Sequence, residues 1–111
     1  MKIHLIKRQS VLLFAQSQAR GRVSFEEWLE KIRYADWRTP TDIKQTFASA
    51  DFLGRSSRRI VFDIGGNKYR IICKYVFGET SVHLFVCWIG THKEYTKLCL
   101  KEMQYSIHTY E

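Results

Sequence analysis

The spacing of apolar residues changes along this chain, and that change constrains the fold more than any other feature. In the first half, apolar residues recur at three- and four-residue intervals, which is typical of amphipathic helices. From Arg58 onward they alternate with a period of two, as in half-buried strands. Helices followed by antiparallel strands predict an α+β fold, with two N-terminal helices packed on one face of a small, mainly antiparallel sheet. The other face is then expected to be free for function.

The helical half contains recognisable start and stop signals. Residues 8–19 are predicted to form an amphipathic helix that ends near Gly21. A second helix is predicted to begin at Ser24, because Ser24-Phe-Glu-Glu27 has the capping-box pattern. A short helix capped by Thr41 is expected over residues 41–47.

The second half reads as a series of strands joined by turns. Alternating residues 60–64 and 68–75 flank Gly65-Gly66-Asn67, which is a hairpin signal. Residues 82–89 are almost entirely apolar, as expected of a central strand, and residues 2–6 are predicted to form an opening strand. The pattern Thr91-His-Lys-Glu94 predicts a second capping box and a short helical turn.

Length and composition indicate one domain spanning residues 1–111. A chain of 111 residues with 45 % apolar composition buries enough surface to fold without disulfides or a structural metal ion. Its three cysteines, Cys73, Cys87 and Cys99, are widely spaced and are interpreted as small apolar residues in a reducing compartment. Since there is no signal-peptide pattern and no membrane-length apolar run, we expect a cytoplasmic protein without a membrane partner.

The positive charge is concentrated in one region of the sequence. A net charge of +7 and a pI near 9.5 favour an anionic partner, of which nucleic acid is the commonest. Residues 55–75 hold one acid, Asp63, and the basic residues Arg55, Arg58, Arg59, Lys68, Arg70 and Lys74. Residues 91–111 balance three lysines with three glutamates.

Two groups of side chains are candidates for chemistry. Lys68, Arg70 and Lys74 are predicted to leave the same sheet face, either as a solvated face or as a phosphate-binding stripe. His92, Lys93 and Tyr95 lie in a turn that is also predicted to present helix N-terminal amides to an anion. An imidazole titrates near neutral pH and can serve as an acid or a base.

Other catalytic classes have little support in the sequence. There is no G-x-S-x-G, H-E-x-x-H, P-loop or paired-acid motif. The histidines and cysteines lack the spacing of metal ligands, so neither a metal ion nor another cofactor is expected.

The order of several segments resembles the HigB family of type II toxin–antitoxin toxins over roughly residues 23–100. The segments are residues 35–44, 48–54, 61–70 and 90–95, and the most distinctive are Gly65-Gly-Asn-Lys-Tyr-Arg70 and Thr91-His-Lys-Glu-Tyr95. This resemblance implies a RelE-like toxin domain that cleaves mRNA on translating ribosomes. It also implies a helix-turn-helix antitoxin of the HigA type, through which DNA is contacted only indirectly.

The resemblance also implies the residues of the site. The implied catalytic residues are His92, Arg70, Lys68 and Tyr95. The resemblance implies Asn67 and Lys93 as RNA-binding residues, and the concentration of basic charge in residues 55–75 adds Lys74, Arg58 and Arg59 as further candidates. Such an endoribonuclease needs no metal if the ribose 2′-hydroxyl attacks the adjacent phosphorus in line. Two alternatives remain at this stage, a gyrase poison of the related ParE branch and a non-catalytic RNA-binding module.

Overall fold

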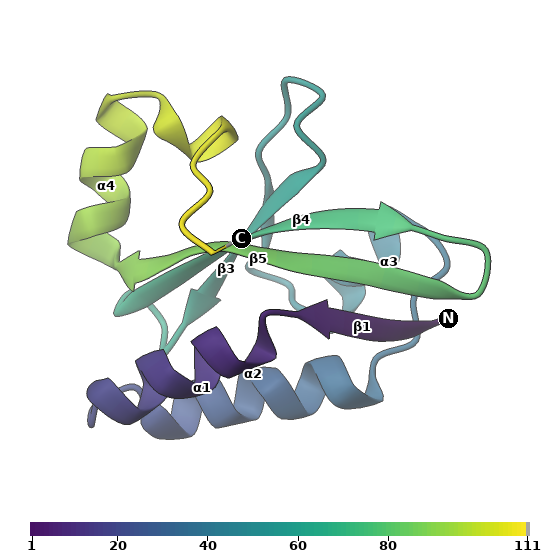
Figure 1. Cartoon of the computed structure of the whole chain (residues 1–111), viewed down its shortest axis with the longest axis horizontal. Coiled ribbons are helices and arrows are strands. Elements are labelled where there is room, and N and C mark those ends of the chain that lie inside the picture. The colour runs from purple at the N-terminus through teal and green to yellow at the C-terminus, as the bar shows by residue number, and fades with distance from the viewer. Residues whose placement is uncertain (111) are drawn as a thin grey trace.

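A mixed sheet forms the centre of the computed structural model, which describes residues 1–110 (Figure 1). Its five strands lie in the order β1-β5-β4-β3-β2 and are β1 (Lys2–Ile6), β2 (Asp51–Phe52), β3 (Arg59–Ile64), β4 (Tyr69–Phe77) and β5 (Ser81–Thr91). Neighbouring strands are antiparallel except for β1 and β5, which run parallel. The predicted α+β class is confirmed, and the parallel pair makes the sheet mixed.

Helices α1 (Arg8–Ser17) and α2 (Arg22–Tyr34) contact one face of this sheet, as Figure 1 shows. Their apolar stripes supply most of the core on that side. Trp28 of α2, for example, packs edge to face on Phe62 of β3 with ring centroids 5.3 Å apart.

The predicted start of α2 at Ser24 is wrong, because the helix begins one turn earlier with Gly21 as its N-cap. A Cβ atom on Gly21 would lie 2.5 Å from the ring of Tyr69. Only glycine allows this close approach, and the contact with the sheet fixes where the helix begins.

Helix α3 (Pro40–Thr46) also begins earlier than predicted. Thr39 rather than Thr41 is its N-cap, and Pro40 occupies the first helical position, where its missing amide hydrogen has no consequence. The Asp42 carboxylate accepts hydrogen bonds from the backbone amides of Arg38 (2.7 Å) and Thr39 (3.1 Å).

The second face of the sheet is partly covered, so the prediction of a free face is wrong. Helix α4 (His92–Leu100) and the 3-10 turn η1 (Met103–Tyr105) lie on this side (Figure 1), and Ile107 packs there as well. They bury a second apolar cluster that includes Val61, Ile72, Cys87 and Leu98. The alternation of β3 and β4 places Val61 and Ile72 on this face, and their apolar surface favours a cover.

The cysteines behave largely as predicted in the described part of the chain. All three are free thiols, and Cys73 and Cys87 are buried. Burial raises the pKa of both of these thiols, so they remain neutral apolar side chains at neutral pH. Across residues 1–110, no helix has the length and apolar character needed to cross a membrane.

Candidate active site

The hairpin between β3 and β4 places Asp63 directly opposite Arg70. Gly65 and Gly66 turn the chain with φ angles of +65° and +67°, a region that favours glycine. Arg70 Nε lies 3.0 Å from Asp63 Oδ1, which forms an ion pair at the base of the turn.

The guanidinium of Arg70 is hydrogen-bonded to residues in and next to the turn. It is 7 % exposed and donates hydrogen bonds to the carbonyl oxygens of Gly66 (3.2 Å) and Tyr69 (2.9 Å). It also donates to Asn67 Oδ1 at 3.3 Å. Arg70 does lie on the predicted face of β4, but its partners are protein groups, and it holds Asn67 in place.

The start of α4 lies beside the same turn. The backbone amide of His92 donates to the carbonyl oxygen of Lys68 at 3.0 Å, which joins the two most distinctive sequence segments. The predicted capping box is confirmed, since Glu94 N donates to Thr91 Oγ1 (3.1 Å) and Thr91 N donates to Glu94 Oε1 (2.9 Å). The predicted anion site on free helix amides is therefore largely occupied by the protein itself, because three of these amides already have partners.

Exposed polar side chains surround this junction. The side chains of Asn67, Lys68, His92 and Lys93 face solvent, and Tyr95 is half-buried. Within residues 1–110, no ion pair involves either lysine. We call the six residues Asp63, Asn67, Lys68, Arg70, His92 and Tyr95 the turn–helix site.

Two groups in the turn–helix site have shifted pKa values. Partial burial raises the pKa of the Asp63 carboxyl, and the neighbouring charge of Asp51 adds to this effect, while Arg70 and His92 oppose it. Burial likewise raises the pKa of Tyr95 well above its ordinary range, and a hydrogen bond with Cys99 contributes in the same direction. Tyr95 is therefore a neutral hydroxyl at physiological pH and is suited to donate a hydrogen bond.

The structure gives Arg59 a role other than RNA binding. Arg59 is 7 % exposed, and its Nη1 donates to the carbonyl oxygens of Gln104 (3.2 Å) and Ile107 (2.7 Å). Arg55 behaves similarly, since it pairs with Glu102 at 3.1 Å and lies 4.2 Å from the ring centre of Tyr105. These two arginines attach the C-terminal segment to β3 and to the loop that precedes it.

The other predicted RNA-binding cations, Arg58 and Lys74, are exposed but lie apart from the turn–helix site. Arg58 directly precedes β3. Lys74 lies on β4, four residues beyond Arg70, and is the register partner of Arg59 on β3. The structure thus brings together Asn67, Lys68, Arg70, His92, Lys93 and Tyr95, and it leaves Arg58, Arg59 and Lys74 outside that group.

Sequence reasoning missed the role of Asp63, which was noted only as the one acid of the basic region. The sequence indicated the hairpin but not its register. The loop spans residues 65–68, so Ile64 pairs with Tyr69 and Asp63 with Arg70, whereas a turn confined to residues 65–67 would pair Asp63 with Tyr69. Sequence reasoning also missed Asp51 on β2, whose carboxylate raises the pKa of both Asp63 and Tyr95.

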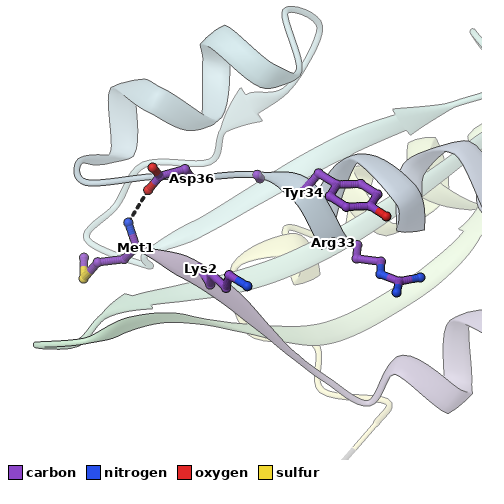
Figure 2. Close-up of a pocket in the computed structure, with 6 residues that line it drawn as sticks. Met1, Lys2, Arg33, Tyr34 and Asp36 are labelled. Atoms are coloured by element: carbon purple, nitrogen blue, oxygen red, sulfur yellow. Dashed lines mark hydrogen bonds and ion pairs between the residues drawn. The ribbon is translucent and has the colours of Figure 1, made fainter.

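A separate hollow lies at the end of α2 and shares no residue with the turn–helix site. It is lined by Met1, Lys2 and residues 33–36, and the Met1 ammonium pairs with the Asp36 carboxylate, as Figure 2 shows. Because its one carboxylate is already paired, this hollow offers no arrangement of acid and base.

Comparison with known proteins identifies the family of this chain. A family model described as HigB_toxin, the RelE-like toxic component of a toxin–antitoxin system, matches residues 22–98. A protein of Escherichia coli O6:H1 named mRNA interferase HigB is 26 % identical over 96 residues, which is 86 % of this chain and 91 % of that protein. The matched region contains the whole turn–helix site. The chain therefore belongs to the HigB toxin family, the RelE-like toxic components of toxin–antitoxin systems.

Proposed function

We propose that this protein is an mRNA interferase, an endoribonuclease toxin that cleaves mRNA on translating ribosomes in the cytoplasm. Membership of the HigB toxin family and similarity to a protein named mRNA interferase support the proposal. The observation that carries it is the hydrogen bond between His92 N and Lys68 O, which gathers exposed cationic and acid–base side chains at one point.

The turn–helix site suits a reaction that needs no metal ion. In this reaction the ribose 2′-oxygen attacks the adjacent phosphorus, the bond to the 5′-oxygen breaks, and a 2′,3′-cyclic phosphate forms. One group removes the 2′-hydroxyl proton and another protonates the leaving 5′-oxygen. His92 is exposed at the first position of α4, and it is our candidate for the acid or the base.

The remaining residues stabilise charge or hold position. Lys68 and Lys93 are exposed cations that can bind the phosphate as negative charge builds on it. Tyr95 supplies a neutral hydroxyl or a stacking surface. Because its guanidinium is buried in contacts with the turn, we propose that Arg70 acts through Asn67 and Lys68 as a positioning residue.

The family implies an antitoxin partner. We propose that this antitoxin is a helix-turn-helix protein of the HigA type, and that the complex reaches DNA through the antitoxin alone.

The test is to induce the protein in cells without antitoxin and to map new mRNA 5′ ends against the reading frame. We expect translation to stop and the new ends to keep a fixed phase within codons. On programmed ribosomes, His92→Gln should lower single-turnover cleavage roughly 10²- to 10⁴-fold, while His108→Gln, a change at an exposed histidine outside the site, should not. DNA damage without mRNA loss would instead indicate gyrase poisoning, and undiminished translation with folded protein present would refute the proposal.

A further inference from the structure

The exposed positive charge of the folded protein is distributed differently from the charge of the sequence. Three arginines of the basic region 55–75, Arg55, Arg59 and Arg70, are engaged by Glu102, backbone carbonyls and Asp63. The C-terminal region, which is balanced in sequence, becomes locally basic. The carboxylate of Glu94 caps α4 and that of Glu102 pairs with Arg55, whereas no ion pair in residues 1–110 involves the lysines of α4 and its C-cap.

These lysines form a stripe along the exposed side of α4. Lys93, Lys97 and Lys101 follow at four-residue intervals and are all exposed, while Leu98 faces the sheet. At 1.5 Å of rise per residue, the stripe extends about 12 Å from the turn–helix site. It therefore offers a path for a polyanion that leaves the cleavage point.

A hollow with an aromatic wall lies beside this stripe. It measures about 320 Å³ and is lined by Trp88, Glu94, Lys97, Leu98, Lys101 and Met103. This volume is at the lower end of the range of about 300–1,000 Å³ for small-molecule sites, and it suits one planar ring system. Its two lysines outnumber its one carboxylate, an oxygen of which is already hydrogen-bonded to Thr91 N.

The indole of Trp88 is held in place on its inner side. A Cβ atom on Gly90 would lie 2.4 Å from the Trp88 ring, so the glycine lets the indole lie close over the strand. Tyr95 packs beside it with ring centroids 6.1 Å apart. Trp88 is half-buried, whereas Trp28 and Trp37 are 3 % and 0 % exposed. A fixed, partly exposed aromatic ring in a hollow that is also lined by cations is an arrangement that binds unpaired bases by stacking.

We propose that Trp88, Lys97 and Lys101 form a subsite for one unpaired nucleotide of single-stranded RNA, apart from the cleavage point. The base stacks on Trp88, and the flanking phosphates lie against Lys97 and Lys101. This inference rests on the proposed function for its biological role, and it assigns the subsite to substrate affinity rather than to the chemical step.

The tryptophan distribution allows a direct test on the full chain. A 2′-O-methyl octanucleotide of mixed sequence binds but resists cleavage, because its 2′-oxygens are blocked. We expect it to quench tryptophan emission in the wild type, and we expect Trp88→Phe to lose most of the quench. Trp88→Leu should weaken affinity roughly 5- to 100-fold.

The lysines provide a test that does not depend on packing. In Lys97→Ala/Lys101→Ala, the negative slope of log affinity against log salt should decrease in magnitude by about 1.4, since each contact with a single strand contributes about 0.7. The matched control is Lys2→Ala/Arg33→Ala, which removes the same charge at the hollow of Figure 2 and should leave the slope unchanged.

The outcomes separate this inference from the proposed function. Wild-type affinity and salt slope in the double-lysine variant, or tryptophan emission that does not respond to the oligonucleotide, would overturn the subsite even if the protein cleaves mRNA. The subsite would also be overturned if the double-lysine variant lost antitoxin binding but kept its affinity for the oligonucleotide. Quenching and a reduced slope in a protein that never cleaves RNA would support the subsite and refute the interferase proposal.

Discussion

Arg59 links the sheet to the C-terminal segment, and Arg59→Met tests that link. Arg59 is nearly fully buried on β3, and its Nη1 bonds the carbonyl oxygens of Gln104 and Ile107. Methionine keeps an unbranched apolar stem but has no donor. The change therefore removes both hydrogen bonds while keeping most of the packing.

The expected loss of stability follows from these two contacts. A hydrogen bond from a charged group contributes about 1.5–3 kcal/mol, so two contribute about 3–6 kcal/mol. Removing the cation also removes the cost of burying it, which offsets part of this loss. We expect the free energy of unfolding to fall by about 3 kcal/mol and Tm to fall by about 12 °C, at about 4 °C per kcal/mol for a chain of this size.

Urea and thermal unfolding measure the global effect, and hydrogen exchange at Thr109 measures the local one. The Thr109 amide donates to Cys87 O at 2.8 Å, so its exchange should accelerate when the segment detaches. Arg58→Met is the matched control, because Arg58 is an exposed neighbour and its replacement should change stability by less than about 0.5 kcal/mol. The reasoning fails if Arg59→Met is as stable as this control and Thr109 stays protected.

Three further predictions concern the turn–helix site and its surroundings. Arg70→Ala should lower stability by about 3 kcal/mol in urea unfolding, because the Asp63 carboxylate loses its partner; a wild-type midpoint would contradict this. Because the folded-state pKa of Asp63 is raised, its ionisation destabilises the fold as pH rises from about 4 through that pKa. Asp63→Asn should remove this decline from the stability profile, and identical profiles would exclude the effect. Gly90→Ala should cost about 1–3 kcal/mol and shift tryptophan emission, since its Cβ would lie 2.4 Å from the Trp88 ring; an unchanged spectrum and midpoint would show that the ring is not held there.

The residues of the turn–helix site other than Asp63 could be predicted from sequence because they depend on local geometry. Alternation along β4 separates Tyr69 and Ile71 from Arg70 and Ile72 in any strand of this sequence. The capping box at the start of α4 needs only residues 91–94, and it formed as predicted. The N-caps of α2 and α3 were misplaced by three residues and two residues, because a contact with Tyr69 and a proline decided between neighbouring caps.

The sequence by itself determined the helical and strand periods, the presence of the hairpin and the gathering of polar residues into two short segments. Tertiary structure decided which charges remain available to a ligand. Arg55 donates a hydrogen bond to Glu102, which lies 47 residues later in the sequence, and Arg59 donates one to the carbonyl oxygen of Ile107, 48 residues later. A charge count along the chain therefore placed the positive field on residues 55–75, whereas folding leaves uncompensated lysines on α4. The physical reason is that electrostatic pairing depends on distance in space, and those distances exist only after the C-terminal segment packs on the sheet.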